Sequence, residues 1–305
     1  MLQQPPDQSS EIGTFAYLSS LRRIYNASQA TGLYVGLTTE KKILAGDLAQ
    51  RKILVLPAAE FVPGPVRDAI LSWVEGGGTL IVSPDSLLAD EYARPADTLA
   101  KLGLRMVRRE PAPLKHGETV VTEYNVHELP LMAFTTNGTR FEAVGLRQVL
   151  ECPAAAVGGR FQDGVPALVR QQRGRGTVYW LAAALEPASW RRFLSMVAQQ
   201  AGLEPALKVT AEAGSTAEQV EYRVTEFEGR RLAYLYNNSE RDSHLVLKPE
   251  FAYGRMLDLR SQAPIEAGRL FVPAGETAII EFQGPAGVAS GRWPESVKQQ
   301  WKSRP

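Results

Sequence analysis

Three polar residues, Glu60, Asp85 and Ser86, follow two short aliphatic runs and are the first candidates for a functional site. The runs Lys52–Leu56 and Thr79–Val82 have the length and composition of strands buried on both faces. In open α/β sheets, ligands bind beyond the carboxyl ends of such strands. A simpler interpretation is that Asp85 or Ser86 caps the next helix. Since no catalytic partner can be identified for them, we expect a binding role and no catalytic residue.

The residues of the turn after the second run argue against two classes of enzyme that carry a nucleophile in such a turn. A glutamine amidotransferase would place a nucleophilic cysteine there, but this chain has Ser83-Pro84-Asp85-Ser86, and its one cysteine, Cys152, lies elsewhere. Ser83 is not part of a Gly-x-Ser-x-Gly elbow, which speaks against an α/β-hydrolase. A single cysteine also excludes an intrachain disulfide, and we expect Cys152 to be a small buried residue.

The sequence motifs give no indication of a metal, phosphate or cofactor site. The histidines His116, His127 and His244 are far apart and form no His-x-x-His or His-Glu-x-x-His pair. Gly76–Gly78 precedes a strand, and Arg173–Gly176 lies in an expected hairpin, so neither has the helix N-terminus that a phosphate loop requires. The 33 acidic residues single out no pair for glycoside cleavage. We therefore expect no metal and no cofactor.

The length and the net charge of the chain limit the classes of protein to which it can belong. The 305 residues suggest two domains, and 34 basic against 33 acidic side chains give a net charge of +1. That balance gives no electrostatic reason to expect nucleic acid or an anionic membrane as partner. No apolar run approaches ~18 residues, and the polar start of the chain lacks the apolar core of a secretory signal. We therefore expect a cytoplasmic protein with no membrane span.

The stretch Arg51–Asp85 is the structural centre of the prediction. Pro63 and Pro65 can open a helix, because the first turn tolerates a missing N–H group. Apolar residues at three- and four-residue spacing follow, as in a helix packed on a sheet. These residues are Val66, Ala69, Ile70, Trp73 and Val74. Gly76–Gly78 ends the helix. The two strands and this helix make a right-handed parallel crossover.

Strands and helices are expected to alternate through the first third of the chain. Ile12–Tyr17 and Leu33–Leu37 have strand-like composition, and Ser19 or Ser20 could cap a helix between them. Further elements are expected after these. They are a short helix or loop at Lys41–Leu48, a helix at Leu87–Leu102 interrupted by Pro95, and a strand at Leu104–Val107. The alternation predicts an open α/β sheet with helices on both faces.

The remaining chain is expected to be richer in strands. Thr119–Tyr124 resembles a strand, Val165–Ala183 a hairpin with a glycine-dependent turn, and Pro187–Ala201 an amphipathic helix ended by Gly202. Short strands at roughly 8–12-residue spacing then predict a small all-β sandwich. They are Glu218–Glu226, Arg231–Tyr236, His244–Leu247, Arg255–Leu259 and Thr277–Phe282.

The expected organisation is a disordered N-terminus (1–11), an α/β domain (12–206), a C-terminal β-sandwich domain (207–283) and a polar tail (284–305). The tail contains Trp293 and Trp301. We expect it to dock on this chain or on a neighbour, because exposed aromatic surface is costly.

Several motifs together resemble the C-terminal region of glycoside hydrolase family 42 β-galactosidases. They are Leu56-Pro57, Glu75 with Gly77-Gly78-Thr79-Leu80, the hairpin residues Gly174, Gly176, Tyr179 and Leu181, Asp258-Leu259, Gly268-Arg269-Leu270, and Val272-Pro273-Ala274-Gly275 through Ile280-Glu281. The resemblance covers roughly residues 12–283. It implies a flavodoxin-like, class I glutamine amidotransferase-like sheet with an inactive elbow, followed by a small β domain.

The resemblance implies a function without a catalytic residue. In that family the catalytic glutamates lie on a (β/α)8 barrel, which needs about 250 residues and has no room here. The first hypothesis is therefore a non-catalytic assembly and substrate-proximal module of a β-galactosidase-like glycoside hydrolase. Its partners would be further copies in a homo-oligomer, a trimer by resemblance, or a catalytic barrel.

Two alternatives stay open. One is a carbohydrate-binding protein that would use exposed aromatics, with Tyr234, Tyr236 and Tyr253 as candidates. The simpler interpretation of these tyrosines is that they are inward strand residues. The other alternative is an enzyme with an unrecognised site at Glu60, Asp85 and Ser86, which lacks a nucleophile–base pair.

Overall fold

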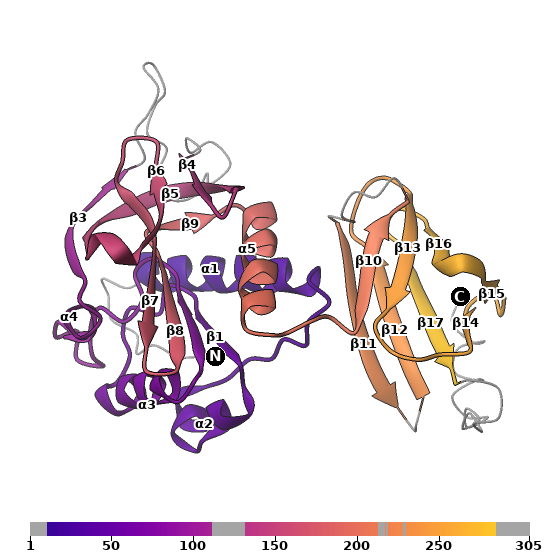
Figure 1. Ribbon diagram of the computed structural model, residues 1–305, viewed down its shortest axis with the longest axis horizontal. Helices are drawn as coiled ribbons and strands as arrows, with labels where there is room; N and C mark the ends of the chain where they lie inside the picture. Colours follow the sequence, from indigo (N-terminus) through magenta and orange to yellow (C-terminus); the bar gives the residue numbers. More distant parts are fainter. Residues whose placement is uncertain (1–10, 112–131, 213–216, 218, 228–229, 285–305) are drawn as a thin grey trace. The chain divides into compact units, whose positions relative to one another are not determined.

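The computed structural model describes residues 11–111, 132–212, 217, 219–227 and 230–284. The chain divides into two compact units (Figure 1). The first comprises Met1–Ala27 and Val35–Leu203, and the second Ser28–Tyr34 and Glu204–Pro305.

The first unit begins with short elements around one parallel crossover. They are helices α1 (Glu11–Gln29), α2 (Glu40–Leu44), η1 (Asp47–Gln50), α3 (Gly64–Glu75) and α4 (Thr98–Lys101), and strands β1 (Ile53–Leu56) and β2 (Thr79–Val82). Strands then predominate. They are β3 (Arg105–Pro111), β4 (Met132–Thr136), β5 (Thr139–Glu151), β6 (Val157–Phe161), β7 (Pro166–Arg173), β8 (Gly176–Leu181) and β9 (Ala183–Leu185), with helices η3 (Ala154–Ala156) and α5 (Pro187–Gln200).

These strands form one mixed sheet of nine strands. Its order is β1-β2-β8-β7-β6-β4-β5-β3, and β9 pairs with β5. The pairs β1–β2 and β2–β8 are parallel, while β8–β7 and every later pair are antiparallel. The α/β class is confirmed, but the expected open parallel sheet is wrong beyond its first three strands, because β4 with β5, β6 with β7, and β7 with β8 are joined as hairpins and not by crossover helices.

The predicted strand–helix–strand centre is confirmed as a parallel crossover. β1 and β2 pair in register from Ile53 with Thr79 to Leu56 with Val82. On α3, Val66, Ile70 and Val74 are at most 1% exposed. Gly77 ends the helix with φ +119°, a conformation that side chains other than hydrogen disfavour. The crossover holds because one apolar stripe of the helix covers the sheet.

The predicted hairpin and the helix after it are also confirmed. β7 and β8 pair up to Arg173 with Gly176. A Cβ atom on Gly176 would lie 2.0 Å from the Val74 carbonyl oxygen, so the turn packs directly on the end of α3. On α5, Trp190 and Phe193 are at most 1% exposed, and Gly202 follows with φ +69°.

Two predicted strands and one predicted helix cap are wrong, and one further predicted strand is not tested. Ile12–Tyr17 lies within α1, so Ser19 and Ser20 are helix-interior positions and not caps. The apolar positions Tyr17, Leu21 and Ile24 continue at helical spacing through that segment and favour one helix. Leu33–Leu37 forms no strand. The expected strand Thr119–Tyr124 lies outside the described residues.

Leu87–Leu102 is mostly a loop, not the expected helix. Only Thr98–Lys101 is helical. The backbone N–H groups of Leu87 and Leu88 donate to the carbonyl oxygens of Ala59 and Glu60, at 2.8 and 3.1 Å. These long-range hydrogen bonds satisfy the backbone in place of a helix. As a result, neither Asp85 nor Ser86 caps a helix.

Among its described residues, the second unit is built mainly of β-strands, in agreement with the predicted β-rich C-terminal part. Its strands are β10 (Leu207–Ala211), β11 (Val220–Phe227), β12 (Arg230–Asn237), β13 (Ser243–Pro249), β14 (Arg255–Asp258), β15 (Pro264–Ile265), β16 (Arg269–Val272) and β17 (Thr277–Gln283), with one short helix, η4 (Glu266–Gly268). They make antiparallel sheets ordered β10-β13-β16 and β11-β12-β17-β14-β15. Leu207, Leu245 and Ile280 share one apolar core between the sheets.

Candidate functional site

The first candidate site lies beyond the carboxyl ends of β1 and β2. The chain there adopts left-handed backbone at three residues other than glycine: φ is +47° at Ala58, +63° at Asp85 and +59° at Leu87. Such conformations are uncommon outside glycine and mark tightly held turns. The turn at Asp85 is therefore a sharp elbow after β2, and we call it the Asp85 elbow.

The structure brings Glu60 and Asp85 together on one arginine that the sequence did not single out. The Arg109 Nε atom lies 2.9 Å from Asp85 Oδ1, and its Nη2 atom lies 3.6 Å from Glu60 Oε1. Asp85 Oδ1 also accepts a 3.1 Å hydrogen bond from the Gln148 amide. All three charged side chains are about one-third exposed, at 32% for Glu60, 34% for Asp85 and 39% for Arg109.

Ser86 does not face this group. It is 0% exposed, its hydroxyl accepts from the Ala59 N–H at 3.0 Å, and it donates to the Leu56 carbonyl oxygen at 3.1 Å. Ser83 likewise accepts from the Ala58 N–H at 2.7 Å. Both hydroxyls therefore hold the turn after β1 against the Asp85 elbow.

Sheet register explains why Arg109 and Gln148 converge on the Asp85 elbow. They are direct partners on the antiparallel strands β3 and β5. Gln148 is 1% exposed, and its side-chain oxygen accepts a 3.0 Å hydrogen bond from the indole of Trp180. A buried amide with its donor and acceptor both engaged is fixed in orientation. It presents its N–H to the carboxylate of Asp85.

This arrangement can hold charge, and neither a cysteine nor a histidine takes part in it. A guanidinium and an amide surround the carboxylate at the apex of the elbow. Among the described residues, the single cysteine is Cys152 on the loop after β5, and the single histidine is His244 in the second unit. Burial raises the pKa of the Cys152 thiol, which disfavours the reactive thiolate.

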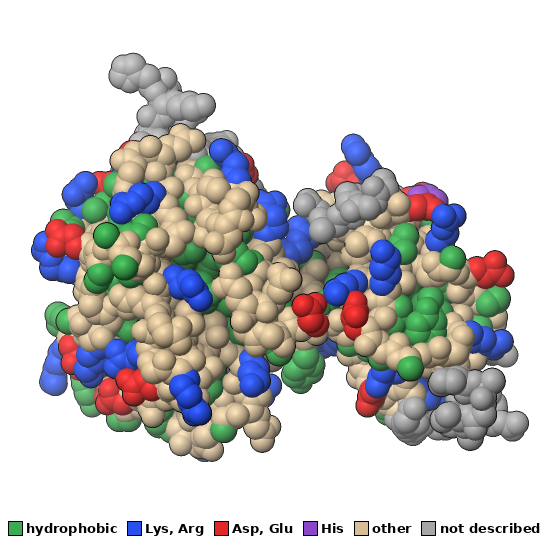
Figure 2. All heavy atoms as spheres, viewed as in Figure 1, with side chains coloured by type: hydrophobic (Ala, Val, Ile, Leu, Met, Phe, Trp, Pro, Cys, Tyr) green, Lys and Arg blue, Asp and Glu red, His purple; other side chains and the backbone are tan. Residues whose placement is uncertain are grey.

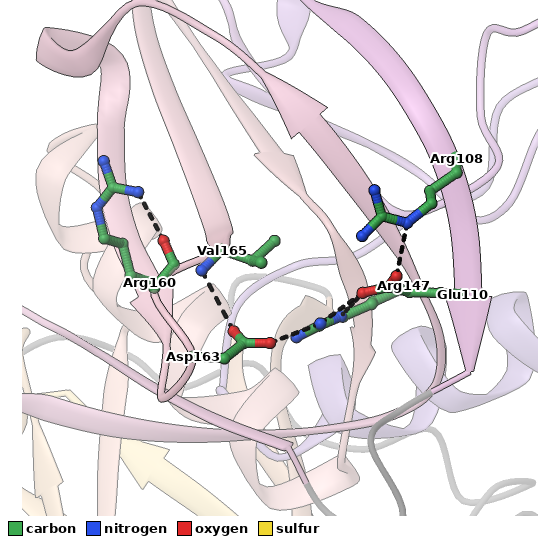
Figure 3. Close-up of polar contacts among 7 residues, drawn as sticks. Arg108, Glu110, Arg147, Arg160, Asp163 and Val165 are labelled. Atoms are coloured by element: carbon green, nitrogen blue, oxygen red, sulfur yellow. Dashed lines mark hydrogen bonds and ion pairs between the residues drawn. The ribbon is translucent and has the colours of Figure 1, made fainter.

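A second polar cluster surrounds Arg147 on β5. Arg147 is 5% exposed, and its guanidinium bonds Glu110 on β3 and Asp163 in the β6–β7 turn, the latter at 2.6 Å (Figure 3). Arg108 contacts Glu110 from the other side at 2.8 Å. The Arg147 Nη1 atom is buried without a hydrogen-bond partner among the described residues. We call this group the Arg147 cluster.

The charged groups of the Arg147 cluster shift one another's pKa values. The hydrogen bond from Arg147 holds the pKa of Glu110 below its ordinary value, with Arg108 assisting, and the same arginine lowers the pKa of Asp163. Burial acts to lower the pKa of Arg147, but the hydrogen bonds that it donates to Asp163 and Glu110 outweigh burial and raise that pKa. All three groups therefore stay ionised at neutral pH.

Within the described residues, no group of three or more histidine, cysteine, aspartate or glutamate side chains could hold a metal ion. His116 and His127 lie outside the described residues. In the same described part of the chain, no helix is long and apolar enough to cross a membrane.

Exposed tyrosines are the remaining candidates. The face shown in Figure 2 has basic and acidic side chains interspersed, so charge alone selects no binding surface there. Tyr234 and Tyr236 are 38% and 39% exposed, and Tyr253 is 37% exposed. The two on β12 alternate with the core residues Ala233 and Leu235, so the simpler interpretation that they point inward is wrong.

One more exposed tyrosine, Tyr92, lies on a tightly built loop of the first unit. It is 70% exposed. Asp90 Oδ1 accepts from the backbone N–H groups of Tyr92 and Arg94, both at 2.9 Å. The Arg94 guanidinium lies 5.1 Å from the centre of the Tyr92 ring. We call this segment, 90–95, the Tyr92 loop.

Comparison with known proteins places the first unit in a family. The family model of the beta-galactosidase trimerisation domain matches residues 5–204. The chain is 28% identical over 197 residues to beta-galactosidase BglY of Alicyclobacillus acidocaldarius, an alignment that covers 60% of this chain and 27% of that protein. It is 23% identical over 270 residues to beta-galactosidase BgaP of Planococcus sp., covering 85% and 37%.

Solved structures show the same fold. Gan42B, a GH42 beta-galactosidase, aligns with a TM-score of 0.69 and 20% identity over 92% of this chain and 38% of that chain. The beta-galactosidase of Bacillus circulans sp. alkalophilus aligns with a TM-score of 0.66 and 16% identity over 87% and 37%. The chain thus spans about 27–38% of the length of these relatives.

Proposed function

The chain belongs to the beta-galactosidase trimerisation domain family, and from this membership we propose that it is the assembly module of a β-galactosidase-like glycoside hydrolase. The observation that carries the proposal is the family match over residues 5–204, which takes in nearly all of the first unit. The Asp85 elbow supports it, since a carboxylate paired with a guanidinium stands where an amidotransferase would need a thiolate.

The proposed partners are further copies of the chain, three in all, and a catalytic barrel. The curated relatives are longer, and this chain covers 27% and 37% of two of them. A (β/α)8 barrel of about 250 residues fits within the uncovered remainder. We further infer an amidotransferase-like core in the parallel strands β1, β2 and β8, with the Asp85 elbow as its inactive turn and Glu60 and Asp85 as binding residues.

The Tyr92 loop is the surface we assign to this assembly. Tyrosine is enriched among the residues that dominate interface energies. Two hydrogen bonds to Asp90 and the bridge between Ala89 and Pro95 hold the loop in one conformation. Little conformational entropy is then lost when a neighbour covers the ring, because the loop is ordered beforehand.

The test is light scattering after size-exclusion chromatography, over a dilution series. We expect a mass of three chains that persists on dilution. Tyr92→Ala is expected to raise the concentration at which the assembly half-dissociates by at least about thirtyfold, the equivalent of about 2 kcal/mol at an interface hot spot. Tyr236→Ala, in the second unit, is the matched control and should leave the mass unchanged. A monomer at every concentration contradicts the proposal.

A second candidate function is carbohydrate binding by the second unit. It is favoured by one observation, the exposure of Tyr234 and Tyr236 side by side on β12. Aromatic rings in such positions can stack on sugar rings. Oligosaccharide binding that Tyr236→Ala abolishes, in a chain that is a monomer at every concentration, would support this function in place of assembly.

A further inference from the structure

A pocket of the first unit shares no lining residue with the Asp85 elbow or the Tyr92 loop. Its volume is about 360 Å³. It is lined by residues of β7 and β8, the β4–β5 turn, the segment from η3 into β6, and the last turns of α5. Its polar lining consists of Thr136, Asn137, Arg170, Tyr179 and Gln200, and its apolar lining includes Val157, Leu168 and Met196.

The pocket contains a fixed chain of hydrogen bonds. Arg170 and Tyr179 are direct partners across β7 and β8, and the Arg170 Nε atom donates to the Tyr179 hydroxyl at 3.2 Å. That hydroxyl in turn donates to the side-chain oxygen of Gln200. Tyr179 is 3% exposed, and its ring meets Phe193 edge to face at 5.9 Å. The buried ring is therefore held in place, and its hydroxyl links the exposed side chains of Arg170 and Gln200.

The polar groups of the pocket that have no hydrogen-bond partner are mainly hydrogen-bond donors. The terminal nitrogens of Arg170 and the side-chain nitrogen of Gln200 have no hydrogen-bond partner among the described residues. The lining includes no aspartate and no glutamate. A guanidinium without a carboxylate partner favours an anionic group and can bind a carboxylate through two parallel hydrogen bonds. The amide of Asn137 and the hydroxyl of Thr136 suit neutral hydroxyl groups of a ligand.

We propose that this pocket binds a small sugar acid. Arg170 takes the carboxylate, Asn137 and Gln200 take hydroxyl groups, and Val157 with Met196 lies against the C–H groups of the sugar. A volume of about 360 Å³ can hold a molecule of monosaccharide size. The site is separate from the Tyr92 loop, so its failure leaves the proposed assembly function standing, and the reverse also holds.

Isothermal titration calorimetry on the full chain tests the class of ligand. The probes are sodium D-galacturonate, D-galactose and inorganic phosphate. We expect one galacturonate per chain, with galactose and phosphate each at least about tenfold weaker, because the first lacks the charge and the second the hydroxyl pattern. No binding of galacturonate overturns the proposal. An affinity for phosphate equal to that for galacturonate also overturns the proposal, because it would reveal a general anion site. An affinity for galactose equal to that for galacturonate overturns it as well, because it would reveal a neutral sugar site.

Variants test the residues. Arg170→Met should weaken galacturonate binding by at least about tenfold, and Gln200→Ala, at an exposed helix end, by about threefold or more. Arg241→Met, at an exposed arginine of the second unit, makes the same change of charge and should bind like the parent chain. Thermal unfolding identifies any variant that fails to fold, and Gln200→Ala then carries the test. Unchanged binding in folded Arg170→Met, or an equal loss in Arg241→Met, overturns the assignment.

Discussion

Arg109 and Arg147 lie on the neighbouring strands β3 and β5 and each joins two carboxylates, but water reaches them differently. The Arg109 side chain is 39% exposed and bridges Asp85 and Glu60. That of Arg147 is 6% exposed and bridges Glu110 and Asp163. An exposed ion pair contributes about 0–1 kcal/mol, whereas breaking a buried one costs about 3–5 kcal/mol. The same chemistry is therefore expected to contribute more to the stability of the sheet at Arg147 than at Arg109.

The largest effect is expected from Arg147→Met. It should lower the free energy of unfolding by about 3 kcal/mol, the lower end for a broken buried pair, because both carboxylates keep some contact with water. Urea unfolding followed by tryptophan fluorescence measures it, since Trp180 and Trp190 are buried in the first unit. A loss below about 1 kcal/mol would place Arg147 in the same class as Arg109.

A smaller effect, in the same direction, is expected from acid. Hydrogen bonds from Arg147 hold the pKa values of Glu110 and Asp163 below their ordinary 4.5 and 3.8. A carboxyl whose pKa is lower in the folded state contributes stability above its unfolded pKa and loses it as the pH falls through the folded value. Stability should therefore fall as the pH drops below about 4.5, more steeply in the parent chain than in Arg147→Met. Urea midpoints from about pH 6 to about pH 3 should converge; a constant gap between the two proteins speaks against this linkage.

The smallest effect is expected from Arg109→Met. Its contacts with Asp85 and Glu60 are in reach of water, so the free energy of unfolding should change by no more than about 1 kcal/mol. The same urea titration compares it directly with Arg147→Met. A loss above about 2 kcal/mol would show that the Asp85 elbow is as rigidly built as the Arg147 cluster and would remove the contrast.

Those parts of the fold that depend on local signals could be predicted from the sequence. Pro63 and Pro65 at a helix start, Gly77 at its end and the aliphatic runs beside them predict the crossover because each acts on its own neighbours. The wrong predictions lie in segments whose conformation is determined by residues far away in the sequence. The first residues of the 87–97 loop donate backbone hydrogen bonds to the carbonyl oxygens of Ala59 and Glu60, and no pattern within the loop reveals that.

The residues of the candidate site likewise divide into those that could be predicted from the sequence and those that could not. Glu60 and Asp85 could be found because strand ends in an α/β sheet are a general place for polar side chains. Arg109 and Gln148 could not, because their meeting depends on the register between β3 and β5. In that pairing a bulge between Met106 and Arg108 shifts the partners by one residue. A sequence gives no measure of such a shift.

The pairing of β2 with β8 has a consequence for synthesis of the chain on the ribosome. Thr79 pairs with Thr177, so about 100 residues separate the partners. At about 5–20 residues per second, one edge of β2 waits about 5–20 s for its neighbour to emerge. All four residues of β2 are buried in the finished sheet, and until β8 arrives this apolar edge is open to other chains. The nascent protein thus passes through an interval in which chaperone binding competes with aggregation.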